Sequence, residues 1–118
     1  MNYNVVLLLT LAAFSAATGQ VLFKLGASGA QTLVDFFNPK IFTGLLFYGV
    51  GTAIWIYALS SELLVNVYAF TALTFVLVYL AGIFFLGEYI NTAGLLGVAF
   101  VLGGLYLITA HGSLVVKT

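Results

Sequence analysis

The sequence predicts an all-α membrane protein in which four transmembrane helices form one up-down-up-down bundle. Of its 118 residues, 64% are hydrophobic and only 5% are charged, whereas soluble domains carry roughly 25% charged residues. No charged side chain occurs in residues 1–23, 41–61, 63–87 or 89–110. Each run reaches the roughly 20 residues that a helix needs to cross a hydrocarbon core. The runs are continuously apolar and lack the period-two alternation of a β-barrel.

The whole chain, residues 1–118, is expected to form one transmembrane domain with no soluble domain. Short second and third loops force successive helices to run antiparallel, which gives the up-down order. The few lysines lie on both sides of such a bundle, so the positive-inside rule leaves the orientation open, dual topology included. The predicted helices span about 3–26, 40–60, 63–86 and 92–110.

The connections carry recognisable helix boundaries. Residues 27–39 form the longest connection and contain several apolar side chains, so we expect a short amphipathic turn at the membrane interface there. Asn38 followed by Pro39 is typical of an N-cap and a first helical residue, and it begins the second helix. Asn91 is expected to cap the fourth helix in the same way.

Gln20 and Lys24 are the first candidate site residues. They are four residues apart, so on a helix they share one face, and Lys24 is the only cation of the first apolar segment. Polar groups at membrane depth normally face a protein interior or a watery cavity, and they mark substrate sites. The alternative is that Lys24 only snorkels to the headgroups from the helix end.

Aromatic and hydroxyl side chains recur at helical spacing in the second and third segments. Tyr48, Thr52 and Trp55 form one row, and Tyr68 and Thr71 begin another. These rows could line a groove for an amphiphile, with hydroxyls for its polar groups and rings for its chain or sugar. The alternative is ordinary packing or interfacial anchoring, which is the commoner role of aromatic residues in membrane helices.

Glu88 is the last candidate for substrate binding. It ends the third segment on the same membrane side as Lys24. An ion pair between the two, within one chain or across a dimer, is one interpretation. A solvated loop acid is the other.

Small residues predict a dimer interface on the fourth helix. Gly97 and Gly104 are seven residues apart and share a face, and Ala93 precedes Gly97 by four residues. Such spacing lets membrane helices approach closely. The alternative is packing within the bundle. A four-helix chain has little interior for a large substrate, which favours a homodimer, or a heterodimer with a paralogous small subunit.

Several functions are excluded by what the sequence lacks. It has no cysteine and no arginine, so we expect no thiolate metal site and no basic patch for nucleic acid. No metal-ligand spacing, phosphate-binding loop or nucleophile–base set occurs. We therefore expect neither an enzyme nor a metal or other cofactor. No acid lies in the middle of any predicted helix, so the usual titrating carboxylate of a proton-coupled exporter is missing.

Four stretches taken together resemble the drug/metabolite transporter superfamily. Within it, the chain resembles four-helix proteins related to the small multidrug resistance family, and most closely the small subunits of the 4-amino-4-deoxyarabinose-phosphoundecaprenol flippase. The resemblance extends from Ser15 to Ala110. The stretches are Gly19-Gln20 with Lys24, Tyr68-Ala69, Leu86-Gly87-Glu88, and the run Gly97-Val98-Ala99-Phe100-Val101-Leu102-Gly103-Gly104.

The resemblance has informative departures. Drug-exporting members carry a glutamate three residues before the glycine that matches Gly19, and this chain has Ala16 there. The position of their helix-three tryptophan is occupied by Thr71 in this chain. The flippase subunits carry a proline where this chain has Ala69. Glycines matching Gly97 and Gly104 form the dimer contact of the small multidrug resistance family.

The resemblance and the residues lead to one expected function and two alternatives. The expected function is a dimeric flippase of the inner (plasma) membrane that moves a polyprenyl-phosphate-linked sugar, or a similar anionic amphiphile, between leaflets. Its partner is thus a membrane lipid or lipid-linked sugar. The first alternative is a small multidrug resistance-like exporter of small cations or metabolites. The second is a non-transporting membrane subunit of a larger complex.

Overall fold

The computed structural model describes residues 3–111, and every regular element in that range is a helix, so the all-α prediction is confirmed. Two short helices, the 3-10 helix η1 and α3, precede the second and third long ones. The elements are α1 (Tyr3–Ala27), η1 (Leu33–Phe36), α2 (Pro39–Leu59), α3 (Leu64–Tyr68), α4 (Phe70–Phe85) and α5 (Thr92–His111).

The helices are those of a membrane protein. Three helical stretches are long and apolar enough to cross a membrane, namely Tyr3–Ala27, Pro39–Leu59 and Leu64–Phe85, and Thr92–Ile108 is a shorter apolar stretch. Large apolar side chains cover the outside, with Phe85 82% exposed and Phe100 79% exposed. Apolar surface of this extent suits lipid, and it indicates a multi-pass membrane protein.

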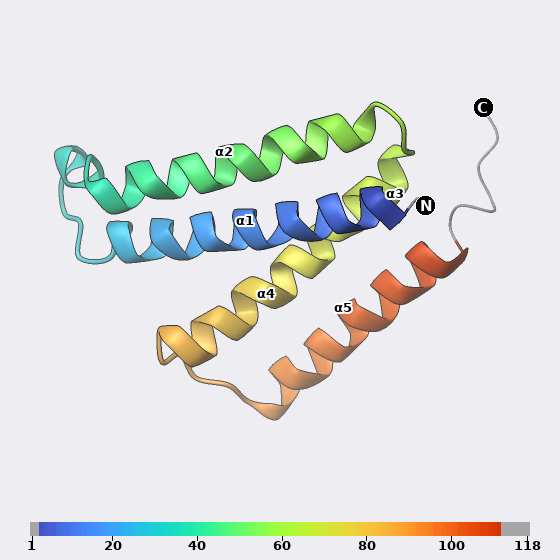
Figure 1. Ribbon diagram of the computed structural model, residues 1–118. Helices are drawn as coiled ribbons and strands as arrows, with labels where there is room; N and C mark the ends of the chain where they lie inside the picture. Colours follow the sequence, from blue (N-terminus) through green and yellow to red (C-terminus); the bar gives the residue numbers. More distant parts are fainter. Residues whose placement is uncertain (1–2, 112–118) are drawn as a thin grey trace.

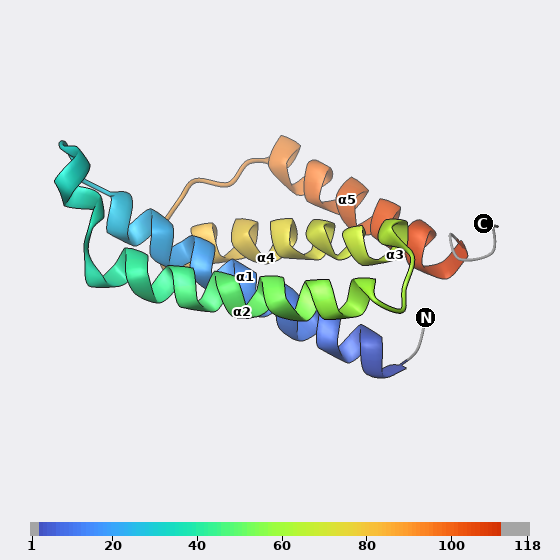
Figure 2. The ribbon, with the colours of Figure 1, turned by 90° about the horizontal axis from the view of Figure 1, so that it is seen from above.

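The long helices lie in a layered order. Helices α1 and α2 run side by side in opposite directions, and α4 lies between this pair and α5 (Figure 1 and Figure 2). The contact between α1 and α2 is the most extensive one, and α5 packs chiefly along α4. None of the α5 side chains that the structure describes is buried. The bundle is therefore closed on the α1–α2 side and open along α5.

Glycines bring the backbones of α1 and α2 together. A Cβ atom on Gly19 would lie 2.7 Å from the Gly44 carbonyl oxygen, and one on Gly44 would lie 2.9 Å from the Gly19 carbonyl oxygen. About two turns further along α2, a Cβ on Gly51 would lie 2.8 Å from the Ala12 carbonyl oxygen. Small residues that allow such approach are a common basis of helix association in membranes.

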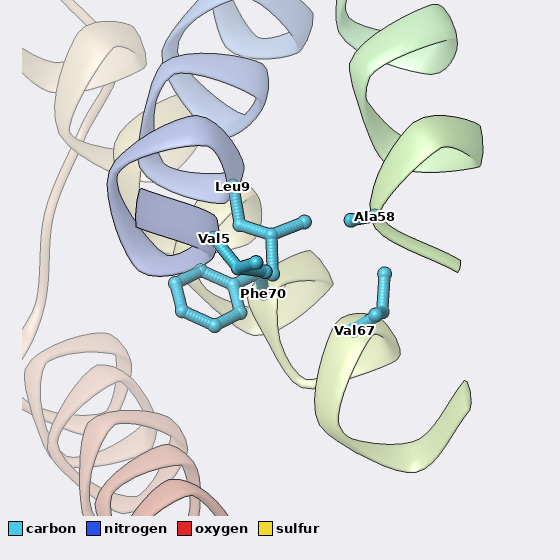
Figure 3. Packing of buried hydrophobic residues seen from close by; sticks show 5 residues of the cluster. All are labelled: Val5, Leu9, Ala58, Val67 and Phe70. Carbon is cyan, nitrogen blue, oxygen red and sulfur yellow. The ribbon is translucent and has the colours of Figure 1, made fainter. Parts of the chain in front are cut away.

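A small hydrophobic core ties four elements together at one end of the bundle. Val5 and Leu9 of α1 meet Ala58 of α2, Val67 of α3 and Phe70 of α4 (Figure 3). Leu9 and Val67 are completely buried. This cluster holds α3 and the start of α4 against the α1–α2 pair.

The third predicted helix, residues 63–86, differs from the structure because it is divided at Ala69. The Ala69 N–H donates to the Val65 carbonyl at 3.1 Å, which is the α-helical spacing, but the Ala72 N–H donates to the Ala69 carbonyl, three residues back, at 3.0 Å. This tighter, 3-10-type turn separates α3 from α4. Neither proline nor glycine, the usual causes of a helix break, lies in the stretch from Leu63 to Ala81.

The predicted helix caps are confirmed. The side-chain oxygen of Asn38 accepts from the Ile41 N–H at 3.1 Å, with Pro39 in the first turn of α2. Its amide nitrogen also donates to the Gly26 carbonyl at 3.0 Å, which ties the two helix ends together. Asn91 accepts from the Gly94 N–H at 2.8 Å at the start of α5.

The connection between α1 and α2 contains the short turn expected there, η1. Its apolar side chains point outward, with Leu33 79% and Val34 74% exposed, as suits a segment at the membrane interface. The N–H groups of Gln31 and Thr32 both donate to the Asp35 carboxylate, at 3.0 and 3.1 Å. These hydrogen bonds lower the pKa of Asp35 because they stabilise its charged form, and the one from Gln31 has the largest effect.

The close contact of α1 and α2 predicts a sharp difference between two alanine substitutions in α2. Gly44→Ala should lower the free energy of unfolding by roughly 1–3 kcal/mol, the usual cost of overpacking, because its Cβ would press on the Gly19 carbonyl. Gly49→Ala is the matched control, since no atom lies within 4 Å of a Cβ there. Unfolding in detergent measures both. Equal stabilities of the two variants would contradict the contact.

The η1 turn predicts a local effect of Asp35. Asp35→Ala should raise the hydrogen-exchange rates of the Gln31 and Thr32 amides, which lose their acceptor. Because the folded pKa of Asp35 is lowered, the carboxylate stabilises the turn above its ordinary pKa of about 3.9, and this stabilisation is lost as the pH falls through the folded value. Hydrogen exchange of the Gln31 and Thr32 amides, measured across this pH range and corrected for intrinsic rates, checks the prediction. The Gly94 amide is the control because its acceptor, the Asn91 side chain, is uncharged.

Candidate functional site

A cavity of about 460 Å³ lies between α1, α2 and the α3–α4 segment, and we call it the polar cavity because hydroxyl and amide side chains contribute to its otherwise apolar lining. Its volume is within the roughly 300–1,000 Å³ of ligand-binding pockets. Leu9 and Phe70 of the hydrophobic core close part of its wall. The cavity is lined by Leu9, Ala12, Ala13, Ala16, Gln20, Tyr48, Gly51, Thr52, Trp55, Tyr68, Phe70, Thr71 and Thr74.

The cavity brings together most of the side chains that the sequence singled out for substrate binding. The Trp55 and Tyr68 rings meet edge to face with their centroids 6.4 Å apart, which joins α2 to α3. The Tyr48 ring packs on Phe23 of α1 at 5.9 Å. The predicted residues that line the cavity are Gln20, Tyr48, Trp55, Tyr68 and Thr71.

Small residues on α1 and α2 make room for these polar groups. Ala12, Ala13 and Ala16 present only methyl groups to the cavity, and Gly51 lies against the α1 backbone. The opposite walls can then hold large rings without filling the space. The close backbone contact of α1 and α2 and the presence of the cavity thus have the same cause, which is the run of small side chains.

The cavity offers hydrogen-bond donors and hydroxyl oxygens. The hydroxyls of Thr52 and Thr74 donate to carbonyls of their own helices, Tyr48 at 3.0 Å and Phe70 at 3.3 Å, so their oxygens still accept. Sequence reasoning did not select Thr74, although its position three residues after Thr71 places both on one helix face.

Lys24 lies outside the cavity. Its side chain is exposed and does not line the walls. It follows Gln20 by four residues, which is about 6 Å along the α1 axis. The predicted shared face is therefore present, but only its Gln20 end and Ala16 reach the cavity, and Lys24 is left nearer the helix end.

Glu88 is positioned by the end of α4 and forms no ion pair with Lys24 within residues 3–111. Gly87 has a positive φ of 69°, which turns the chain back, and the Glu88 N–H donates to the Gly82 carbonyl at 2.9 Å. The Glu88 carboxylate lies over Gly82, where an added Cβ would be 2.5 Å from Oε1. The predicted ion pair is thus not made within the chain.

The electrostatic character of the cavity is neutral. None of its lining residues is an acid or a base, and the three acids of the chain, Asp35, Glu62 and Glu88, all lie elsewhere. A cation in the cavity would therefore meet no carboxylate. An anion would meet hydroxyl and amide donors.

Asn66 is a polar residue that sequence reasoning did not select. It lies in α3 and is only 4% exposed, and it is the only buried polar side chain among the described residues. A buried amide at membrane depth is costly, so a lone asparagine in the charge-free run 63–87 was the available signal. Asn66 does not line the walls of the cavity.

The predicted dimer residues make no tight helix contact through Gly97 or Gly104 within the described chain. Ala93 and Gly97 are exposed, and no atom lies within 4 Å of a Cβ placed on Gly97 or Gly104. Gly104 borders a groove between α4 and α5. At the start of α5, by contrast, Gly94 is in close contact with the Tyr79 hydroxyl, and there the two helices touch.

Comparison of the chain with protein-family models, with curated proteins and with solved structures found no match. Any functional conclusion therefore rests on the residues and on the geometry of the cavity.

Proposed function

We propose that this protein is a flippase-type transporter that moves a polyprenyl-phosphate-linked sugar, or a similar anionic amphiphile, between the leaflets of the inner membrane. The observation that carries the proposal is the polar cavity among apolar helices, lined in part by hydroxyl and amide groups and by no acid. Such a cavity suits a head group that accepts many hydrogen bonds.

The charge distribution supports an anionic head group. Gln20, Tyr48 and Thr71 supply donors at the walls, and Lys24 supplies the positive charge about one helical turn beyond Gln20. A charge-assisted hydrogen bond from an ammonium to a phosphate is about twice as strong as a neutral one. In the proposed function, Lys24 attracts the phosphate to the mouth of the cavity and the neutral donors receive it.

Two features fit the resemblance to the flippase subunits. The helix break between α3 and α4 falls at Ala69, the position at which those subunits carry proline. Ala16 lines the cavity, so the position at which drug exporters carry their glutamate faces the site but is uncharged. The second feature also argues against the cation-exporter alternative.

The proposal includes a four-span topology and a dimer. Helix α5 has no buried side chain among those described, and its exposed residues include Ala93 and Gly97. A second copy, or a paralogous small subunit, covering this helix would complete the bundle. A non-transporting subunit of a larger complex would use the same surface, and the tests below separate the two.

The proposal predicts that Lys24→Met abolishes transport and leaves a folded protein. Undecaprenyl phosphate should raise the melting temperature of the purified wild type. At a ligand concentration a hundredfold above Kd, the free energy of unfolding should increase by about 2.7 kcal/mol. The rise in melting temperature should vanish in Lys24→Met. Lys40→Met is the control, since Lys40 is also exposed but lies in the first turn of α2 and not on the Gln20 face of α1.

Other outcomes of this titration identify the alternatives. Stabilisation by a quaternary ammonium compound alone would favour the exporter. Normal transport by Lys24→Met would contradict the phosphate role of Lys24. Loss of all ligand response after purification, together with co-purification with a larger enzyme, would favour the non-transporting subunit.

The dimer predicts an effect of bulk on α5. Gly97→Leu should weaken self-association roughly tenfold or more, because its side chain would stand where a second helix must approach closely. The same change at Gly49, an open position on α2, is the control. Mass measurements in detergent or nanodiscs across a dilution series check the prediction. Equal association of both variants would contradict an interface at Gly97.

A further inference from the structure

A second groove of about 470 Å³ runs between α4 and α5, and its lining is almost wholly apolar. Ala72 and Phe75 form its α4 wall, and Val101 and Gly104 belong to its α5 wall. The groove exists because α5 touches α4 at Gly94 and Tyr79 and carries no side chain at Gly104 to fill the space further along.

The groove borders the polar cavity. Tyr68 and Thr71 line both, so the groove and the cavity are neighbours at the break between α3 and α4. A larger apolar groove, of about 700 Å³, lies on another side of α4 at Leu77 and Ala81, but it shares no lining residue with the polar cavity. Of these two apolar grooves, the α4–α5 groove is therefore the one that adjoins the polar cavity.

We infer that the α4–α5 groove holds the apolar chain of the amphiphile whose phosphate head group occupies the polar cavity. This inference rests on the proposed function. In this arrangement the ligand passes Tyr68 and Thr71, the two residues that line both the cavity and the groove. The groove thereby assigns a chain-binding role to Ala72, Phe75 and Gly104.

Packing, rather than the hydrophobic effect, makes this site selective. Lipid tails are as apolar as the groove, so a chain gains little by leaving the bilayer for an apolar wall. It gains dispersion contacts with a fixed surface, here with the Phe75 and Phe100 rings. Affinity should therefore depend on chain length and on groove shape.

The experiment uses the protein's single tryptophan. Trp55 lines the polar cavity, so its fluorescence reports when that cavity is occupied. The full chain in phosphatidylcholine nanodiscs is titrated with undecaprenyl phosphate, with geranyl phosphate, which has the same head and a short chain, and with undecaprenol, which has the same chain and no charge.

The test variant is Ala72→Leu, which fills the groove from α4. Its control is Ala81→Leu, which adds the same side chain to α4 at a half-buried position in the other apolar groove. Gly104→Leu fills the same groove from α5, where a Cβ meets no atom within 4 Å, and it keeps the test valid if Ala72→Leu does not fold.

The expected result is a loss of about tenfold in affinity for undecaprenyl phosphate in Ala72→Leu, as overpacked sites show. Affinity for geranyl phosphate should be unchanged, and Ala81→Leu should behave as wild type. Unchanged affinity for undecaprenyl phosphate in both groove variants overturns the inference and leaves the proposed function intact. A loss confined to Ala81→Leu also overturns it, because it places the chain in the other groove.

Two further outcomes separate the two proposals. If undecaprenyl phosphate and undecaprenol bind the wild type equally and Ala72→Leu weakens both, the chain site stands and the phosphate role fails. If Ala72→Leu or Gly104→Leu instead dissociates a dimer, as mass measurement would show, a second copy occupies the groove and the inference is overturned.

Discussion

The close approach of α1 and α2 is the constraint on which the rest of the structure depends. Gly19 and Gly44 let the two backbones touch, and a Cβ on Gly19 would also lie 2.9 Å from the Tyr48 nitrogen. That contact brings Gln20 and Tyr48 to one cavity. Gly51 repeats this contact about two turns away, against Ala12 and Ala16. The same small residues therefore join the helices and leave the space between them open on one side.

Much of the local structure could be predicted from the sequence because its causes are local. Charges are so rare that the acids and lysines mark where helices end, and Asn38 and Asn91 cap their helices with their own side chains. The rows that contain Tyr48 with Trp55 and Tyr68 with Thr71 follow from helical spacing alone. Their convergence on one cavity required in addition that α2 and α4 face the same side of α1.

The remaining features depend on contacts between helices that are apolar all round, where no amphipathic pattern tells which face points inward. The break at Ala69 follows no proline or glycine, and it accompanies the packing of Val67 and Phe70 into the core. Glu88 was expected near Lys24 because both end helices on one side. The left-handed turn at Gly87 directs the Glu88 carboxylate to Gly82 instead. Such tertiary choices leave no periodic trace in the sequence.

The placement of Lys24 outside a neutral cavity is what the cost of charge in a membrane favours. An ammonium at the centre of a membrane helix costs about 2.5–3.5 kcal/mol or more, whereas near a helix end it keeps part of its hydration. Hydroxyl and amide donors carry no such charge cost, so they can line the cavity. In the proposed function, the charge of Lys24 attracts an anion and the uncharged donors of the cavity receive it, so both favour an anion over a cation. Because no lysine lines the cavity, the proposed ligand would also be released without breaking an ion pair there.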